Sequence, residues 1–335
     1  MIPVKIIGTG MYVPGEAIDN TELKALASIE FDHLKTEEKL GIYKRHNAKL
    51  RGIDETTADF ATKAAQNAIE NAGISANDIG LFIVGTDTPE FITPATSILV
   101  QGRIQGGETW ASTFDVSASC ASFAIAFDNA VRIMATDSSI KYAVVIGVYN
   151  MPAFIRPDDT FGYSIFADGA GAVVIEKRFS EATGYVDGQL LTDGTQWNFI
   201  GIYAGGSRNP ITPDLIDRKQ HGLLSLQPLP GDRNVRLWPM VIEKLLNKAG
   251  KNINEVDHFI FTQINKSVII KVMDELKQPI EKTSFVMDRY GYTGSGCIPI
   301  AFHHAVQEKK IKRGDLVLFM ASGAGLAVGS NLFVY

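Results

Sequence analysis

The chain has 335 residues, 45% of them hydrophobic and 21% charged, which excludes intrinsic disorder and predicts about two domains with a sizeable core. Its net charge of −5, without long runs of one sign, gives no support to nucleic-acid binding. The longest apolar runs are too short to span a membrane, and the amino terminus lacks the pattern of a secretory signal. Two cysteines are too few for a disulfide framework, and the six histidines lack the spacing of zinc ligands. We therefore expect a cytoplasmic protein that binds no nucleic acid, no membrane and no metal.

Short β-rich apolar runs alternate with helical stretches along the chain. In the first half, the pattern predicts helices at residues 55–71 and 120–135 and strands at residues 4–8, 81–85, 113–116, 142–148 and 172–176. Gly73 is placed to end the first helix, and Pro94 opens another at a position where its missing N–H costs nothing. The strands are apolar throughout, which favours a sheet covered by helices on both faces.

The second half is predicted to repeat this alternation. It contains helices at residues 235–248, 266–276 and 294–307 and strands at residues 259–262, 284–287 and 316–320. The segment 200–232 is rich in glycine and proline and has weak periodicity. A segment of this length in a compact protein is typical of a functional excursion or lid.

A direct internal match indicates a duplication. Ala126-Phe-Asp-Asn-Ala-Val and Ala301-Phe-His-His-Ala-Val share four residues at the same offsets, and each precedes an apolar strand. Each strand then leads into a glycine-rich turn, Asp168-Gly-Ala-Gly or Ser322-Gly-Ala-Gly. The short identity alone does not exclude chance, but two matched motifs in the same order favour a duplicated α/β unit. We place the two halves at residues 1–180 and 181–335.

Cys120 is the candidate nucleophile. It follows the apolar run Phe114-Asp-Val-Ser-Ala-Ser and starts the predicted helix. The unpaired N–H groups at a helix N-terminus favour the thiolate over the thiol, and the small neighbours leave room for a substrate. The alternative is a buried cysteine that packs as a small hydrophobe, and Cys297 fits that alternative better. A nucleophilic cysteine forms thioesters, so acyl transfer is the expected chemistry, with backbone N–H groups of the turn at Ser322 as a candidate oxyanion hole.

The chain resembles the β-ketoacyl-acyl carrier protein synthase III group of the thiolase superfamily. The resemblance lies in the segment around Cys120, in Asp168-Gly-Ala-Gly-Ala-Val-Val-Ile, in Asp288-Arg-Tyr-Gly-Tyr-Thr and in the carboxy-terminal Gly314-Asp-Leu-Val-Leu-Phe-Met-Ala-Ser-Gly-Ala-Gly-Leu. These segments occur in the order of the family and span essentially the whole chain. The resemblance implies a thiolase-like α/β fold with five αβαβα layers, built from two duplicated halves. It also implies a homodimer in most cases.

The resemblance assigns roles to particular residues. It makes Cys120 the nucleophile and places the oxyanion hole at the amide of Cys120 and in the turn at Gly323 and Ala324. The histidine of the family falls on Thr262 and the asparagine on Tyr292, so two catalytic side chains are replaced. In the family, these side chains bind the malonyl thioester oxygen during decarboxylation. Both replacements offer a hydroxyl donor, but neither acts as a base at neutral pH as imidazole does.

Three further residues are expected to bind substrate. Thr93, which precedes Pro94, falls where the family has a bulky residue on the floor of the partner's acyl pocket, so a longer or bulkier acyl chain is expected. Asn265 and Lys266 fall on the side where substrate enters, together with Lys39. Lys266 and Lys271 are expected to meet an acidic carrier protein or the phosphates of phosphopantetheine, although solvated surface lysines are the common alternative. The thioester is then a substrate, and no permanently bound cofactor is expected.

The leading interpretation is an acyltransferase of fatty-acid or secondary-metabolite biosynthesis. It takes an acyl group onto Cys120 from a coenzyme A or acyl carrier protein thioester and passes it to a carbon, hydroxyl or amine acceptor. A second interpretation is a degenerate, non-catalytic subunit of a heteromeric synthase, because two catalytic side chains are replaced. A third is a thioesterase, which needs a water-activating base that the sequence does not identify. The choice between homodimer and heterodimer stays open.

Overall fold

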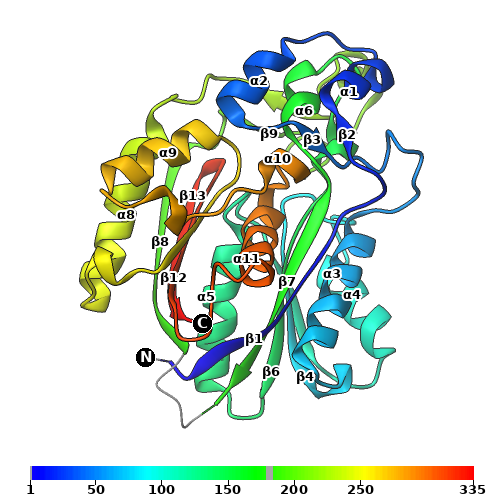
Figure 1. Cartoon of the computed structure of the whole chain (residues 1–335). Helices are drawn as coiled ribbons and strands as arrows, with labels where there is room; N and C mark the ends of the chain where they lie inside the picture. The colour runs from blue at the N-terminus through cyan, green and yellow to red at the C-terminus, as the bar shows by residue number, and fades with distance from the viewer. Residues whose placement is uncertain (1, 179–183) are drawn as a thin grey trace.

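The computed structural model describes residues 2–178 and 184–335, in which helices lie between and outside two main sheets (Figure 1). The first sheet has the order β1 (Val4–Tyr12), β7 (Gly169–Lys177), β6 (Tyr142–Tyr149), β4 (Ile79–Gly85) and β5 (Ser112–Val116). The second has the order β8 (Gly184–Gln196), β13 (Gly325–Val334), β12 (Leu316–Gly323) and β11 (His258–Phe261). All strands of the first sheet thus fall within residues 4–177, and all strands of the second within residues 184–334. The predicted boundary at residue 180 lies outside the described residues.

The two sheets share one pairing scheme, as the internal repeat predicts. β7 is antiparallel to both β1 and β6, and β4 is parallel to β6. In the second sheet, β13 is antiparallel to both β8 and β12, and β11 is parallel to β12. The senses of these four strands of the first sheet therefore match those of the four strands of the second.

The predicted strand at residues 284–287 is wrong. At the place that β5 holds in the first sheet, the second sheet has one parallel bridge between Phe259 and Thr283. The backbone groups that a strand would use bind the Gln263 side chain instead, which donates to the Ser284 carbonyl at 3.1 Å and accepts from the Val286 N–H at 2.9 Å. The chain then turns into the short helix α10 (Met287–Tyr290).

Five layers result, as the family resemblance implies. Helices α3 (Thr57–Ala72) and α4 (Thr96–Gln105) cover the outer face of the first sheet. Helices α5 (Ser122–Thr136) and α11 (Cys297–Gln307) lie between the sheets, the second after the 3-10 turn Gly294–Gly296. Helices α8 (Arg233–Ala249) and α9 (Lys266–Glu275) cover the outer face of the second sheet.

Helix α3 illustrates why the sequence forms this layer. Thr56 and Asp59 form a capping box at its start, and Gly73, in the left-handed region with φ +66°, ends it as predicted. Its alanine-rich face packs so close to β1 that a Cβ on Gly10 would lie 2.3 Å from the Ala68 nitrogen. A small face on the helix and glycine on the strand therefore set this spacing together.

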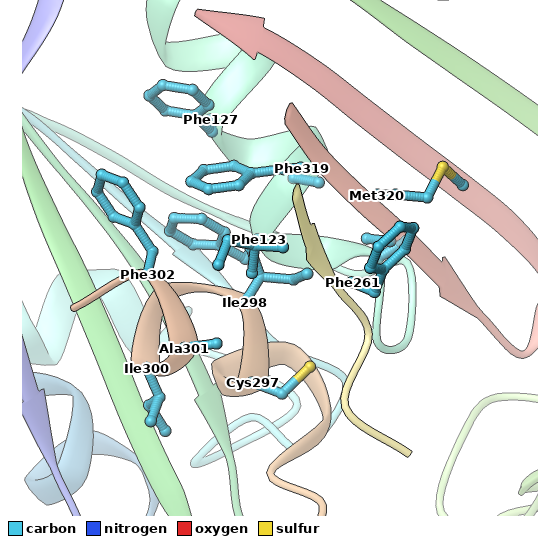
Figure 2. Packing of buried hydrophobic residues seen from close by; sticks show 14 of the residues in the cluster. Phe123, Phe127, Phe261, Cys297, Ile298, Ile300, Ala301, Phe302, Phe319 and Met320 are labelled. Atoms are coloured by element: carbon cyan, nitrogen blue, oxygen red, sulfur yellow. The ribbon is translucent and has the colours of Figure 1, made fainter. Parts of the chain in front are cut away.

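Aromatic side chains fill the space between the sheets. Phe123 and Phe127 of α5, Phe302 of α11 and Phe319 of β12 converge there (Figure 2). The centroid of the Phe319 ring lies 6.1 Å from that of Phe123 and 6.0 Å from that of Phe127, both in the first half of the chain. It lies 5.2 Å from the centroid of the Phe302 ring, in edge-to-face geometry. Residues from both halves thus share one core, which joins the two α/β units.

The remaining elements cap one end of the layers, at the top of Figure 1, or connect the main elements. The cap comprises β2 (Ile18–Asp19), α1 (Asn20–Ala27), α2 (His33–Leu40), β3 (Lys44–Arg45), α6 (Thr160–Ile165), β9 (Ile200–Ile202), α7 (Pro213–Asp217) and β10 (Leu223–Ser225). Four 3-10 turns cover Ala76–Asp78, Met151–Phe154, Ile253–Glu255 and Ile280–Lys282. In the part of the chain that the structure describes, no helix has the length and apolar character needed to cross a membrane.

Replacing Phe319 with alanine tests the shared core. Phe319 is fully buried, and its loss should lower the free energy of unfolding by about 3–5 kcal/mol, through lost burial and the cavity left behind. Denaturant unfolding measures the change. Leu34→Ala, at a side chain of α2 that is 66% exposed, is the control and should change the stability by about 0.5 kcal/mol or less. Equal effects from the two variants would contradict this assignment of the core.

Candidate active site

A cavity of about 560 Å³ lies where the cap meets the end of the layers. Cys120, Asp87, Tyr149 and Tyr292 line its inner part. The predicted excursion contributes much of the outer wall, through Ile200, Gly201, Ile202, Leu223, Leu229, Pro230 and Gly231. The segment 200–232 therefore lines the same cavity as the candidate nucleophile, as a functional excursion would.

Cys120 lies in a tight turn and not in a helix. Helix α5 begins at Ser122, two residues later than the predicted start at Cys120. Ser119, directly before the cysteine, has a φ of +49°, in the left-handed region, and belongs to the same turn. The Ser119 carbonyl accepts hydrogen bonds from the hydroxyls of Ser122 at 2.5 Å and Ser295 at 3.0 Å. Bonds from both halves of the chain thus hold the turn that presents the cysteine.

Gly323 packs directly against this turn. A Cβ on Gly323 would lie 2.7 Å from the Cys120 nitrogen and 2.8 Å from the Ala118 carbonyl oxygen, so a larger residue does not fit. Gly323 and Ala324 line the cavity together with Cys120. The structure therefore brings the three predicted oxyanion residues side by side. That their N–H groups converge on one oxygen stays a prediction.

The electrostatics of Cys120 differ from expectation. Burial and the nearby Asp87 carboxylate raise the pKa of its thiol well above the usual value, whereas a hydrogen bond from the Tyr292 hydroxyl lowers it. The direction of this shift is opposite to the thiolate preference expected from a helix N-terminus, and burial is its largest cause. The guanidinium of Arg233 also interacts electrostatically with Cys120.

Tyr292 is held rigidly beside the cysteine. Its N–H donates to the Ile165 carbonyl at 3.0 Å, and its carbonyl accepts from the Ala167 N–H at 3.0 Å. The centroid of its ring lies 5.8 Å from that of the Phe166 ring and 6.3 Å from that of the Tyr149 ring. Burial raises the pKa of its phenol well above the usual value, so it stays a neutral hydrogen-bond donor at physiological pH.

Thr262 does not line the cavity. It directly follows β11, is 1% exposed, and its Oγ1 accepts a hydrogen bond from the Ser322 N–H at 3.1 Å. Thr262 thus fixes the backbone of the glycine turn at Ser322 without reaching the cavity. None of the histidines in the described residues lines the cavity either. His258 bonds to Ser284, for example, and His303 to Thr9.

Asp87 is a site residue that the sequence analysis missed. It lies just beyond the carboxyl end of β4, and its Oδ1 is buried without a hydrogen-bond partner. Burial raises the pKa of its carboxyl to about 6, against the opposing effect of the Ser119 and Ser295 hydroxyls. The sequence feature that could have identified Asp87 is an acidic residue just after a buried strand. That strand, β4, is parallel to β5, and β5 leads to Cys120.

The predicted substrate-binding residues divide among three places. Asn265 lines the cavity with Lys39, and its side chain caps α9 by accepting from the Val268 N–H at 3.2 Å. Lys266 lines a second cavity of about 520 Å³ instead. The other residues of that second cavity are Tyr43, Lys44, Phe285, Met287, Asp288 and Arg289. Thr93 is exposed and lies apart from both cavities in this single chain.

Five alternating layers with a cysteine beside a glycine turn define a thiolase-like protein. Two family models match the chain. One is described as 3-oxoacyl-[acyl-carrier-protein (ACP)] synthase III and covers residues 114–194, and the other describes the C terminal part of the same synthase and covers residues 246–335.

Full-length relatives carry the same description. A β-ketoacyl-[acyl-carrier-protein] synthase III of Koribacter versatilis (strain Ellin345) is 32% identical over 98% of this chain and 96% of its own. The crystal structure of 3-oxoacyl-[acyl-carrier-protein] synthase III from Aquifex aeolicus VF5 has a TM-score of 0.85 and 30% identity, over 99% of this chain and 100% of its own. This chain therefore belongs to the 3-oxoacyl-[acyl-carrier-protein] synthase III family.

A further structure supports the fold alone. The priming β-ketosynthase from the R1128 polyketide biosynthetic pathway has a TM-score of 0.84 at 24% identity, over 99% of this chain and 96% of its own. The thiolase-like layering predicted from the resemblance is confirmed by these matches.

Replacing Gly323 with alanine tests the close approach behind Cys120. The new Cβ would push the nucleophile turn out of place, and a displacement on this scale should slow acylation of Cys120 by about 100-fold. The rate of acyl-adduct formation by mass spectrometry checks this. Gly206→Ala is the matched control, because a Cβ there meets no atom within 4 Å, and it should acylate at the wild-type rate. An unaffected Gly323→Ala would contradict the geometry.

Alkylation by iodoacetamide tests the electrostatics around Cys120. The rate of its alkylation should keep rising above pH 9, because the raised pKa keeps the thiol protonated at lower pH. At pH 8, Asp87→Asn should speed the reaction severalfold by removing a negative charge, and Tyr292→Phe should slow it by removing a donor to the sulfur. Peptide mapping separates Cys120 from Cys297. Changes of the same sign in both variants would refute the assigned contributions.

Proposed function

We propose that this protein is an acyltransferase that forms an acyl thioester on Cys120. The observation that carries the proposal is the placement of Cys120 in the cavity of about 560 Å³, with Gly323 and Ala324 beside it. The sulfur of Cys120 attacks the thioester carbonyl of the donor, the donor thiol leaves, and the acyl group stays on the protein. The raised pKa of Cys120 means that its proton is lost only during the attack, and this proton ends on the departing donor thiolate. The Tyr292 hydroxyl and the Arg233 guanidinium stabilise the sulfur as its negative charge develops.

The donor is a thioester of coenzyme A or of an acyl carrier protein. Lys39 lines the main cavity, and Lys44, Lys266 and Arg289 line the second, together with the acidic Asp288. Such a cluster attracts the phosphates of the pantetheine arm. The relatives are named as acyl carrier protein synthases, which supports a carrier-protein donor. The thioester is a substrate, so the proposal requires no resident cofactor.

The second step transfers the acyl group to a hydroxyl or amine rather than to a decarboxylating malonyl group. The cavity has no imidazole among its described residues, and Tyr292 is much larger than the asparagine that the family resemblance expects at its position. Both features weaken the binding of a malonyl enolate. The expected setting is fatty-acid or secondary-metabolite biosynthesis.

We also propose that the chain works as a homodimer in the cytoplasm. β5 is an edge strand of the first sheet, and apolar side chains near it are exposed, among them Ile92 at 81% and Trp110 at 88%. An exposed apolar edge favours association with a second copy. Thr93 is next to Ile92 in the sequence. In the proposed dimer, Thr93 of each copy lies toward the cavity of the other copy. Both cysteines are free thiols, which fits a reducing compartment.

Intact-protein mass spectrometry tests the acyl-enzyme. Incubation with acetyl-, butyryl- and octanoyl-coenzyme A and with the matching acyl carrier protein thioesters should add one acyl mass to the wild type. Cys120→Ala should show no adduct. Cys297→Ala is the matched control and should keep it, because Cys297 is fully buried in the core. No adduct from any donor would favour the non-catalytic subunit, and an adduct lost rapidly to water alone would favour a thioesterase.

A further inference from the structure

We propose that Asp87 is the general base of the second step, which takes the proton from an oxygen or nitrogen acceptor as that acceptor attacks the acyl group on Cys120. The inference rests on the proposed acyltransferase function and adds to it the residue that activates the acceptor. It also narrows the acceptor to a neutral hydroxyl or amine.

The geometry around Asp87 supports this role. Asp87 and Cys120 line the same cavity, and the two groups interact electrostatically. The Oδ1 atom of Asp87 is buried without a hydrogen-bond partner, whereas the carboxyl group as a whole also interacts with the hydroxyls of Ser119 and Ser295. A buried carboxylate oxygen without a partner is costly unless a ligand supplies the missing donor. The O–H or N–H of an acceptor in the cavity is such a donor.

The loop that carries Asp87 is held on both sides. Before it, the Thr86 N–H donates to the Val116 carbonyl at 3.0 Å, and Val116 ends the strand that leads to Cys120. After it, Thr88 accepts from the Asn150 N–H at 2.9 Å and its carbonyl accepts from the Thr57 hydroxyl at 2.7 Å. The carboxylate therefore keeps a fixed place relative to the nucleophile, which general-base catalysis requires.

The other titratable groups around the cavity do not serve as the base. Burial raises the pKa of both Tyr149 and Tyr292 well above the usual value, so their phenols stay protonated. Arg233 and Lys39 are cations and cannot accept a proton. Cys297 does not line the cavity, and burial raises the pKa of its thiol to about 12. Asp87 is ionised at neutral pH, and its pKa of about 6 makes it a stronger base than an ordinary carboxylate.

The step balances without a further reactant. The acceptor oxygen or nitrogen bonds to the acyl carbon while its proton moves to Asp87. The bond between the acyl carbon and the Cys120 sulfur then breaks, and the sulfur leaves as a thiolate that the Tyr292 hydroxyl stabilises. The proton passes from Asp87 to the thiolate, which restores both groups. The high pKa of Cys120 favours this return of the proton.

The same carboxylate disfavours a malonyl acceptor. A malonyl group would bring a second negative charge into a cavity that already holds the charge of Asp87. Like charges at short range in a water-poor site repel strongly. Arg233 offers partial compensation, because its Nη1 donates to Gln196 at 3.0 Å while its Nε is buried without a partner. A neutral acceptor meets no such repulsion.

Single-turnover kinetics on the isolated acetyl-enzyme test the inference. Wild type and Asp87→Asn are acetylated with acetyl-coenzyme A, freed of excess donor, and mixed with methanol as a hydroxyl probe or with malonyl-coenzyme A as a carbon probe. Mass spectrometry follows the loss of the acetyl group, methyl acetate and released carbon dioxide. In the wild type, methanol should release the acetyl group at a rate that rises with pH through about 6. Asp87→Asn should acetylate but release the group about 100-fold more slowly, without this pH dependence.

Two further variants separate chemistry from structure. Asp87→Glu keeps a carboxylate and should restore part of the rate. Glu90→Gln changes the same loop at a side chain that bonds the Thr56 hydroxyl and the Ala58 N–H, outside the cavity, and should react like the wild type. Equal release rates from wild type and Asp87→Asn would overturn the inference alone. So would carbon dioxide release from malonyl-coenzyme A that exceeds methanol transfer. Failure of the wild type to acetylate at Cys120 would overturn the proposed function, and this inference with it.

Discussion

The close approach of two backbones at Cys120 is the constraint on which the rest of the structure depends. The turn that carries the nucleophile belongs to the first half of the chain, and the glycine turn that touches it belongs to the second. Because Gly323 leaves no room for a side chain against the Cys120 nitrogen, the two sheets must meet at one fixed separation. The phenylalanines between the sheets fill that separation, and Ser295 of the second half bonds the Ser119 carbonyl of the first. The separation of the two sheets therefore sets both the packing of the core and the geometry of the candidate site.

Much of this arrangement could be predicted from the sequence. The alternation of apolar strands with helices, the repeated Ala-Phe and Gly-Ala-Gly motifs and the small residues around Cys120 indicate two like units with a cysteine at the end of a strand. These features are local or periodic, and so they are visible in a single chain. The strand predicted at residues 284–287 failed because its apolar pattern carries no sign that the Gln263 side chain takes its backbone partners.

The candidate site was predicted less completely, because its electrostatics depend on residues that are distant in sequence. Asp87 precedes Cys120 by a helix and a strand, and only the parallel pairing of β4 with β5 brings them together. Its charge and the burial of the cavity reverse the preference for thiolate that the local context of Cys120 suggests. Thr262 and Tyr292 diverge for a similar reason: the residues around them turn one hydroxyl toward the glycine turn and the other toward the sulfur.

The outer wall of the cavity has a different structural origin from its inner part. The nucleophile, the glycine turn and Asp87 belong to or directly follow the main sheets, whereas much of the wall comes from residues 200–231, whose strands β9 and β10 pair with each other in a sheet of their own. The segment is thus a module that can change in length and composition while the layered scaffold stays intact. Divergence within this fold can therefore alter the size of the accepted acyl chain by exchange of one contiguous stretch. Residues 200–231 are therefore a suitable segment to exchange when selectivity is redesigned, since the exchange does not alter the reacting groups.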